Sequence, residues 1–405
     1  MVRIMIKKWL ETYKNIFNGD AMKFIILMGI VSLFADMTYE GARSISGPYL
    51  AILGASAVTV GFVAGFGELS GYILRFFSGH LADRTRSYWS ITIGGYIINL
   101  MAVPLLALAG SWEVAAVLII VERMGKGLRV PSRDVMLSHA CSQVGHGFGF
   151  GLHEALDQIG AILGPLIVAV VLFYHGSYQI GFAFLLLPAV LAIIVLIISR
   201  FFYPHPHDLE ITTPPLDTEG FRKVYWLYVI AAALIAAGFA DFALIAYHFQ
   251  KTAIVSPVLI PIFYAVAMGV DGVAALVFGR LFDKVGLSIM ILVALLSALF
   301  APMVFLGGFY LAFIGMVIWG ISMGAQESIM RSSVAVMSAV DKRGSAYGIF
   351  NTIFGVSWFA GSLIMGILYS VSITYLVIFS VIIQLVSIPV FITMLKMRNK
   401  INRNP

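Results

Sequence analysis

The pentapeptide GHLAD at residues 79–83 returns in the second part of the chain as GRLFD at residues 279–283. Two further pairs follow in the same order: FAD at 34–36 with FAD at 239–241, and Met124-Gly125 with Met323-Gly324. Because the offsets between the members of each pair are nearly equal, the pattern indicates an internal duplication. The sequence therefore predicts two halves of similar structure.

Composition shows which solvent surrounds most of the chain. Of the 405 residues, 60% are apolar and only 11% are charged, and the mean hydropathy is +0.96. These values exclude a water-soluble globular domain of this length and indicate an integral membrane protein. The single cysteine, Cys141, excludes an internal disulfide framework.

Apolar runs of about 20 residues, the length that crosses the hydrocarbon core of a bilayer, alternate with polar loops. They lie at 23–46, 55–80, 88–110, 113–131, 148–174, 179–201, 223–248, 256–281, 287–307, 309–332, 346–370 and 373–396. We therefore expect an all-α membrane protein with twelve transmembrane helices in two pseudo-symmetric six-helix halves, at 23–201 and 223–396. Residues 1–22 are expected to form an N-terminal cytoplasmic or interfacial segment, 202–222 a central cytoplasmic linker, and 397–405 a cytoplasmic tail.

The lysines and arginines indicate the orientation of these spans. Nearly all of them fall in the terminal segments and in the loops on one side, whereas the opposite side holds only Lys251. The positive-inside rule therefore predicts a cell-membrane protein with both termini in the cytoplasm. Since the net positive charge has this topogenic explanation, we expect no nucleic-acid partner.

With this layout the chain resembles a transporter of the major facilitator superfamily over nearly its whole length. The loop after the second span resembles the family's G-x-L-A-D-R-x-G-R motif, and the other half offers a second copy. The matching residues are Gly79, Leu81, Ala82, Asp83, Arg84 and Arg86, with the second glycine missing, and Gly279, Leu281, Asp283, Lys284 and Gly286. The resemblance implies that both loops act in gating, with the aspartate capping a neighbouring helix and pairing with a basic residue when the carrier is open outward.

Two further motifs are similar to those of the family's proton-coupled efflux branch. Arg123 and Gly127 fit R-x-x-Q-G with Lys126 in the glutamine position, which implies a role of Arg123 in proton transfer; the alternative is that Arg123 only neutralises Glu122 or another buried acid. Arg129 and Arg133 follow, and we expect them at the cytoplasmic end with topogenic and gating roles.

The fifth span contains the second of these motifs. Gly151, Gly160, Gly164 and Pro165 resemble the helix-bend motif of antiporters, although Val168 and Ala169 replace its closing glycines. The resemblance implies export by antiport. Plain helix packing remains the alternative, because glycines also allow close approach of membrane helices.

Carboxylates are unusually frequent inside the predicted spans. Nine of them lie there with only Arg43, Arg75, Arg123 and Lys126 as basic companions: Asp36, Glu40, Glu68, Glu122, Glu154, Asp157, Asp241, Asp271 and Glu327. A carboxylate in hydrocarbon without a partner should take up a proton or hold a cation. The sequence therefore predicts proton or cation handling.

The first span shows this pattern most clearly. In FADMTYEGARS at residues 34–44, Asp36, Glu40 and Arg43 share one helix face. Arg43 can reach back to Glu40 or Asp36, and Asp241 is the repeat equivalent of Asp36. A second helical spacing allows Glu68 to pair with Arg75. The candidate residues for substrate binding or proton coupling are Asp36, Glu40, Arg43, Glu68, Arg123, Glu154, Asp157 and Asp241.

These observations predict a transporter that works by alternating access and exports a small organic solute in exchange for protons. It is expected to act as a monomer in the bilayer and to need no cofactor. One alternative is a carrier of metal ions or organic cations, with Asp36, Glu40, His153 and Asp157 as tentative metal ligands. A remote alternative is an intramembrane metalloenzyme, because His153, Glu154 and Asp157 are similar to the H-E-x-x-H helix of zinc hydrolases.

Overall fold

The computed structural model describes residues 19–144, 146–206, 223–337 and 343–403, and this part of the chain is helical throughout, with short connections. The predicted central linker is largely outside it, at 207–222. The first half contains α2 (Asp20–Ile52), α3 (Ala57–Thr85), α4 (Tyr88–Leu105), η1 (Leu106–Leu108), α5 (Trp112–Val144), α6 (His146–His175), α7 (Tyr178–Phe184) and α8 (Leu186–Phe202). The second contains α9 (Lys223–Gly238), α10 (Phe242–Thr252), α11 (Leu259–Val285), η3 (Gly286–Ser288), α12 (Ile289–Leu306), α13 (Phe309–Met337), α14 (Arg343–Val371) and α15 (Ile373–Arg403).

Twelve helical segments correspond to the twelve predicted spans. Eleven of those in the described ranges are long and apolar enough to cross a membrane. The twelfth, α5, is long enough but carries Glu122, Arg123, Lys126 and Arg129 in its middle. The all-α, twelve-helix architecture is therefore confirmed, and the charges of α5 explain why it is the least apolar span.

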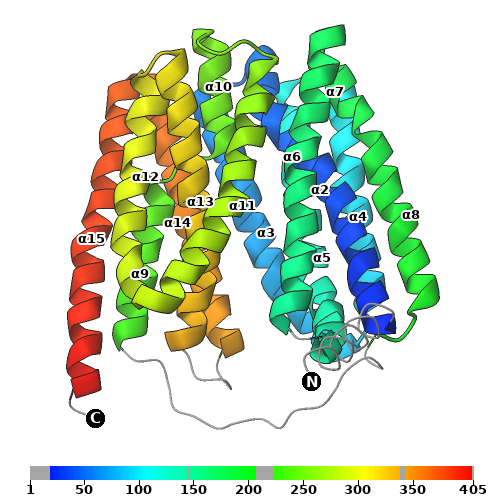
Figure 1. Cartoon of the computed structure of the whole chain (residues 1–405). Coiled ribbons are helices and arrows are strands. Elements are labelled where there is room, and N and C mark those ends of the chain that lie inside the picture. The colour runs from blue at the N-terminus through cyan, green and yellow to red at the C-terminus, as the bar shows by residue number, and fades with distance from the viewer. Residues whose placement is uncertain (1–18, 145, 207–222, 338–342, 404–405) are drawn as a thin grey trace, which may run out of the picture.

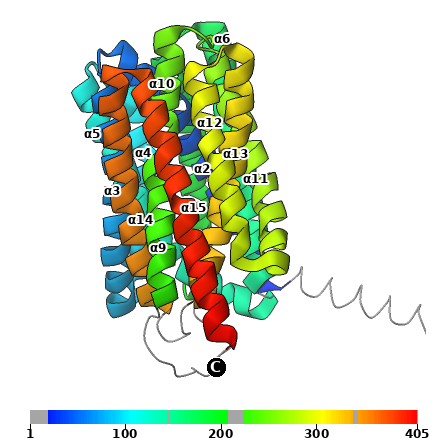
Figure 2. The same cartoon turned by 90° about the vertical axis from the view of Figure 1, so that its left-hand side faces the viewer.

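The helices form two bundles, one of α2–α8 and one of α9–α15 (Figure 1). Asp20, where α2 begins, and Arg403, where α15 ends, lie on one side of the molecule, here called the terminal face (Figures 1 and 2). Ile52 and Ala57, where α2 ends and α3 begins, lie on the opposite side, here called the distal face. An even number of spans in each half returns the chain to the same face.

The two bundles are joined by α2 with α10, α3 with α14, and α6 with α11. Close backbone approaches mark these contacts toward the distal face. A Cβ atom at Gly47 would collide with the carbonyl oxygen of Ala243, and one at Gly366 would lie 2.7 Å from that of Ala57. The bundles therefore meet most tightly at the distal face, and in Figure 1 they diverge toward the terminal face.

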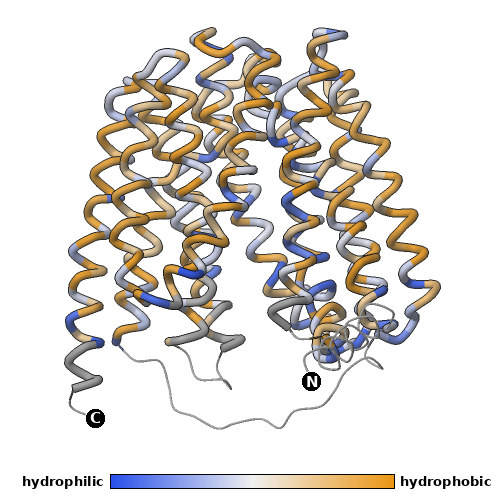
Figure 3. Tube along the Cα trace, in the orientation of Figure 1, coloured by the Kyte–Doolittle hydropathy of each residue, from blue (hydrophilic) through white to orange (hydrophobic). Residues whose placement is uncertain are grey.

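Apolar and polar residues are distributed as expected for a membrane protein. Figure 3 shows long apolar stretches on the peripheral helices α8, α12 and α15, and hydrophilic residues at helix ends and on helices between the bundles. On α8, Ile194, Ile197 and Phe201 are exposed along one face, the arrangement that lipid contact requires. Buried charged residues lie in the interior, some where the halves meet, such as Arg43 and Asp241, and some within the first half, such as Arg129.

Candidate functional site

The seventh span is interrupted in its middle. Helix α9 ends at Gly238 and α10 begins at Phe242, with Asp241 as its N-cap: the Oδ1 atom of Asp241 accepts a hydrogen bond from the backbone N–H of Ala243 at 2.9 Å. Interrupting a membrane helix leaves backbone groups without their helical partners, so other side chains must satisfy them. Breaks of this kind form the binding regions of many carriers.

Side chains of two other helices satisfy the carbonyls at this break. Ser380 Oγ and Gln384 Nε2, both on α15, donate to the Gly238 carbonyl oxygen at 2.6 and 3.0 Å. Trp319 Nε1 of α13 donates to the Ala240 carbonyl oxygen at 3.0 Å. The break is therefore a stable part of the fold.

Asp241 pairs with Arg43 across the two halves. The Arg43 Nη2 and Asp241 Oδ2 atoms are 2.9 Å apart, and both side chains are buried, with 9% and 4% of their surface exposed. Arg43 also lies 3.9 Å from Glu40 and 4.0 Å from Glu68. Of the partners that helix spacing allowed, Glu40 is thus a secondary one, and the closest carboxylate comes from the other half.

Arg123 connects the two acids beside this pair. Its Nε atom is 3.4 Å from Glu68 and 3.3 Å from Glu122, whose Oε1 also accepts a 2.7 Å hydrogen bond from Asn99. Arg123 thus pairs with Glu122, as the alternative to a role in proton transfer requires, and it pairs with Glu68 as well. Glu68 is not within ion-pair distance of Arg75, whose guanidinium lies 5.0 Å from the ring centre of Tyr72.

Asp36 and Glu40 each accept a hydrogen bond from a tyrosine. Tyr39 Oη donates to Asp36 Oδ2 at 3.1 Å, and Tyr264 Oη, from α11 in the other half, donates to Glu40 Oε2. Lys126 Nζ lies 3.8 Å from the ring centre of Tyr39 and within electrostatic reach of both carboxylates. Sequence reasoning missed Tyr264, because an aromatic residue in an apolar span carries no polar signal.

A second polar group lies in the first half, between α2, α5 and α6. His153 Nδ1 is 3.6 Å from Asp157 Oδ2, and Arg133 Nη1 donates to Ser32 Oγ at 3.2 Å. Arg129, only 1% exposed, lies 4.1 Å from the ring centre of Tyr96. Arg129 is therefore buried inside the bundle, and α5 continues to Val144; its predicted place at the cytoplasmic end of the span and its topogenic role stay predictions.

The tentative metal ligands do not form a metal site. Within the described ranges, no three His, Cys, Asp or Glu side chains are placed to hold one metal ion. Asp36 and Glu40 thus contact tyrosines, while His153 contacts Asp157, and Glu154 is an exposed residue of α6. The arrangement does not support the metal-carrier and metalloenzyme alternatives.

The glycines of the fifth-span motif have two different surroundings. A Cβ atom at Gly160 or Gly164 would collide with the carbonyl oxygen of Leu33 or of Met37, both on α2. At Gly151 a Cβ would meet nothing within 4 Å. Gly160 and Gly164 therefore allow α6 to lie against the segment of α2 that carries Asp36, and Pro165 follows inside the helix.

The loop motifs are described only in part. A Cβ at Gly79 would lie 3.6 Å from Pro131 of α5, and one at Gly279 would lie 2.9 Å from Ser328 of α13, so both glycines face the fourth span of their own half. Arg84 and Lys284 are exposed. The side chains of Asp83 and Asp283 lie outside the described residues, so their gating role stays a prediction.

Comparisons with known proteins agree with this architecture. The family model described as Major Facilitator Superfamily matches residues 25–362 and 255–404. An uncharacterized protein of Mycobacterium tuberculosis is 38% identical over 376 residues, covering 91% of this chain and 92% of that protein. An uncharacterized MFS-type transporter of Methanocaldococcus jannaschii is 27% identical over 388 residues, covering 92% of this chain and 94% of that protein.

Two further likenesses are partial or structural. The fosmidomycin resistance protein of Escherichia coli is 32% identical over 137 residues, which are 33% of this chain and 32% of that protein. A crystal structure of a mutant of the nucleoside transporter NupG superimposes with a TM-score of 0.74 at 14% identity, over 92% of this chain and 99% of that one. At this identity the second likeness concerns the fold alone.

Proposed function

Because the chain belongs to the Major Facilitator Superfamily, we propose that this multi-pass membrane transporter exports a small organic solute in exchange for protons. We place it in the cell membrane as a monomer, with the terminal face toward the cytoplasm, as the distribution of lysine and arginine predicts. Since the halves pack most tightly at the distal face, the state described above is then the one closed toward the outside.

The Arg43–Asp241 ion pair is the observation that carries the proposal. It joins the two halves at 2.9 Å with both partners buried, so it stabilises the state in which the distal ends are together. Opening the distal side separates the pair and leaves a buried carboxylate without its cation, which costs several kcal/mol. The pair therefore has to break and re-form in each transport cycle, as a contact that distinguishes the two states of an alternating-access carrier does.

Asp36 and Glu40 are the leading candidates for carrying the exchanged proton. They lie one turn apart on α2, and both are less than a tenth exposed. Glu40 has Tyr264 and Arg43 as partners, whereas no lysine or arginine of the described ranges is within ion-pair distance of Asp36. We therefore assign the proton cycle first to Asp36, with Lys126 as the nearby cation that responds to its charge.

Two observations support export rather than import. Gly160 and Gly164, which match the antiporter-like motif, form the close contact between α6 and the acidic segment of α2. In addition, a protein named for fosmidomycin resistance is 32% identical to this chain over 137 residues, a third of its length, and removal of a harmful compound is one route to resistance.

The proposal is tested in proteoliposomes with a pH-sensitive dye inside. When fosmidomycin or one of a panel of small organic solutes is added to wild-type proteoliposomes, protons should cross the membrane in the direction opposite to the solute. We expect Asp36→Asn to abolish this proton movement while solute counterflow persists, because exchange of solute for solute needs no proton cycle.

Asp20→Asn is the matched control, since Asp20 is on the same helix but pairs with Lys23 at the surface, and it should behave as the wild type. If Asp36→Asn moves protons with an unaltered pH profile, Asp36 is structural and the proposed mechanism fails.

A further inference from the structure

Two side chains of the second half hold neighbouring groups of α2. Asp241 pairs with Arg43 at 2.9 Å, and the Tyr264 hydroxyl donates to the Glu40 carboxylate. Glu40 and Arg43 are one turn apart on α2, and Arg43 Nη1 is 3.9 Å from Glu40 Oε1. An acid and a base thus lie side by side on one helix, and each has its closest partner in the other half.

Asp36 also accepts a hydrogen bond from a tyrosine, but from its own helix. Tyr39 Oη donates to it at 3.1 Å, and this contact moves with α2. Tyr264 is on α11, so its contact with Glu40 has to break when the halves move apart there. Of the two acids, Glu40 is therefore the one whose partner changes during an alternating-access cycle.

Asp241 and Tyr264 leave α2 together. The ring centre of Tyr264 lies 4.2 Å from that of Phe242, the residue that follows Asp241, so a movement of the second half that withdraws one withdraws the other. Glu40 then lacks its hydrogen-bond donor and Arg43 lacks its nearest carboxylate. Because a buried charge without a partner is costly, each of them needs a new one.

Arg43 and Arg123 converge on one place between the halves. Arg43 Nη2 is 4.0 Å and Arg123 Nε is 3.4 Å from the same atom, Glu68 Oε1. Their side chains are 9% and 10% exposed, and neither Arg43 Nε nor Arg123 Nη1 has a hydrogen-bond partner among the described residues. Since a buried donor without an acceptor is unfavourable, these two guanidinium groups can accept a further anionic group.

A small cavity lies at this place. Its volume is about 20 Å³, and its polar lining residues are Arg43, Ser46, Arg123 and Asp241. Such a volume accommodates about one water molecule, and the Asp241 carboxylate lies directly beside it. When Asp241 withdraws, the two guanidinium groups face a larger space, which suits the carboxylate of a solute.

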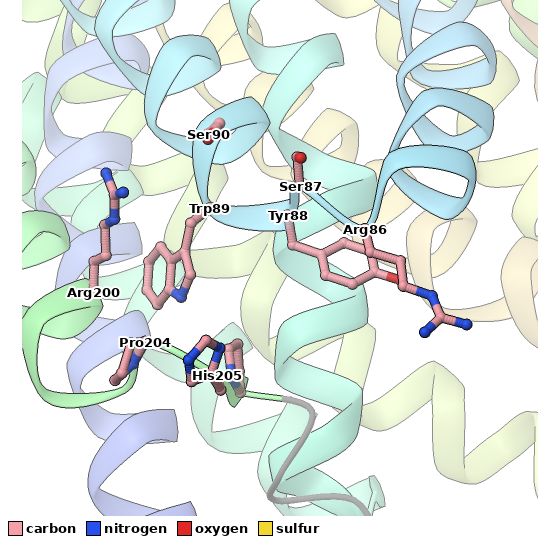
Figure 4. A pocket seen from close by; sticks show the side chains of 9 residues that line it. Arg86, Ser87, Tyr88, Trp89, Ser90, Arg200, Pro204 and His205 are labelled. Carbon is pink, nitrogen blue, oxygen red and sulfur yellow. The ribbon is translucent and has the colours of Figure 1, made fainter.

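The convergence of two guanidinium groups is not a general property of cavities in this protein. A larger cavity of about 290 Å³ lies on the terminal face of the first half, and its lining includes Arg86 and Arg200. Figure 4 shows these two residues on opposite sides of Tyr88 and Trp89, with their guanidinium groups directed apart. That cavity therefore does not offer one anion two arginines, whereas the small cavity between the halves does.

We propose that the transported solute is a small zwitterion of the amino-acid type. Its carboxylate takes the place of Asp241 at Arg43 and Arg123, and its ammonium group takes the place of the Tyr264 hydroxyl at Glu40. In the state closed toward the outside, the two side chains of the second half thus occupy the positions of the solute's charged groups. This solute class rests on the proposed transport function and adds the chemistry that its site recognises.

The solute needs both charges, because each satisfies a different side chain. An amine without a carboxylate leaves Arg43 without a replacement for Asp241, and an acid without an ammonium group leaves Glu40 without a donor. A site built to pair a polar group discriminates strongly against a compound that lacks the matching group. The short distance between Glu40 and Arg43 suits charged groups attached to the same carbon atom, as in an α-amino acid.

Thermal unfolding of the full-length protein in detergent tests the solute class, with each of the protein-forming amino acids as a probe. At least one of them should raise the unfolding midpoint of the wild type. The amine and the acid that lack its carboxylate or its ammonium group should have no such effect at the same concentration. The class is wrong if no amino acid stabilises the protein, as expected when Glu40 and Arg43 simply pair with each other, or if the amine or the acid stabilises it equally.

Tyr264→Phe tests the exchange of partners. It removes the hydroxyl that competes for Glu40 but keeps the ring against Phe242, so the dissociation constant of the stabilising amino acid should fall about tenfold, a typical effect of one hydrogen bond to a charged group. Tyr228→Phe is the matched control, because Tyr228 Oη donates to the Met330 carbonyl oxygen at 3.1 Å within the second half. It should leave the dissociation constant unchanged. The same result for Tyr264→Phe would make Tyr264 purely structural and overturn the exchange.

Counterflow in proteoliposomes distinguishes the solute class from the proposed function. If the stabilising amino acid shows counterflow but moves no protons, the solute class stands and proton exchange fails. If another solute exchanges with protons while amino acids do not cross the membrane, proton exchange stands and the solute class fails.

Discussion

Arg43 has three carboxylates within 4.0 Å, from Asp241, Glu40 and Glu68. Helix spacing allowed Glu40 or Asp36 as the partner, and of these only Glu40 is in contact; the rule is local, whereas Asp241 is 198 residues away in the chain. The sequence could show that acids outnumber bases in the spans. It could not show which acid receives which base, since that depends on how helices of different halves pack.

The unequal sharing of Arg43 leads to a prediction about stability. Arg43→Gln leaves the buried carboxylates of Asp241 and Glu40 without their cation, whereas Glu68 keeps Arg123, so it should destabilise the protein by about 3–5 kcal/mol. Asp241→Asn should cost less, because Arg43 keeps Glu40 and Glu68 and because asparagine remains a good N-cap for α10. Thermal unfolding in detergent measures both.

Lys23→Gln serves as the comparison variant for this experiment, since its ion pair with Asp20 is exposed and should contribute little. If Arg43→Gln and Asp241→Asn lower the free energy of unfolding equally, Arg43 stabilises the fold only through its ion pair with Asp241.

At the scale of the helices, length and hydropathy predicted where the spans are but not how they end or break. Helix α5 extends to Val144, well past its predicted end at 131, because a helix does not have to stop where the hydrocarbon does. The break between α9 and α10 contains no proline. Besides the local cap at Asp241, it is stabilised by Ser380, Gln384 and Trp319 from other helices, and these distant partners are not visible in the local sequence.

The contact between α2 and α6 can be tested by adding a single methyl group. A Cβ at Gly164 would collide with the Met37 carbonyl oxygen, so Gly164→Ala should force the helices apart and destabilise the protein by about 1–3 kcal/mol. Solute counterflow should fall as well, because the displaced segment of α2 carries Asp36 and Glu40. Gly151→Ala, on the same helix but with open space around it, should leave both thermal stability and counterflow unchanged. If the Gly164→Ala protein shows normal counterflow, the contact between α2 and α6 has no role in transport beyond packing.

For the whole molecule, the repeat in the sequence predicted two similar halves, and this is the feature that it predicted best. The repeat does not determine which face of the molecule is closed. That depends on contacts between the halves, such as Gly47 with Ala243 and Arg43 with Asp241, and neither is visible in the pattern of one half. A duplicated sequence is compatible with every state of the transport cycle.

Breaking the ion pair between the halves should therefore redistribute the states. With Cys141, which is buried, replaced by alanine, spin labels at Thr85 and Val285 report on the terminal face, and labels at Ile52 and Tyr310 report on the distal face. Asp241→Asn should shift the population toward shorter terminal and longer distal distances in pulsed electron paramagnetic resonance. Distance distributions identical to those of the unmutated background would exclude the pair from gating.

The two oxygens of Asp241 have separate tasks: Oδ1 caps α10, and Oδ2 pairs with Arg43. A movement of the halves that breaks the contact at Oδ2 leaves the cap at Oδ1 in place. The carrier can thus lose and regain the contact in every cycle without unwinding and rebuilding a helix. Turnover then needs no slow refolding step, because the helix that begins after the break in the seventh span stays capped throughout the cycle.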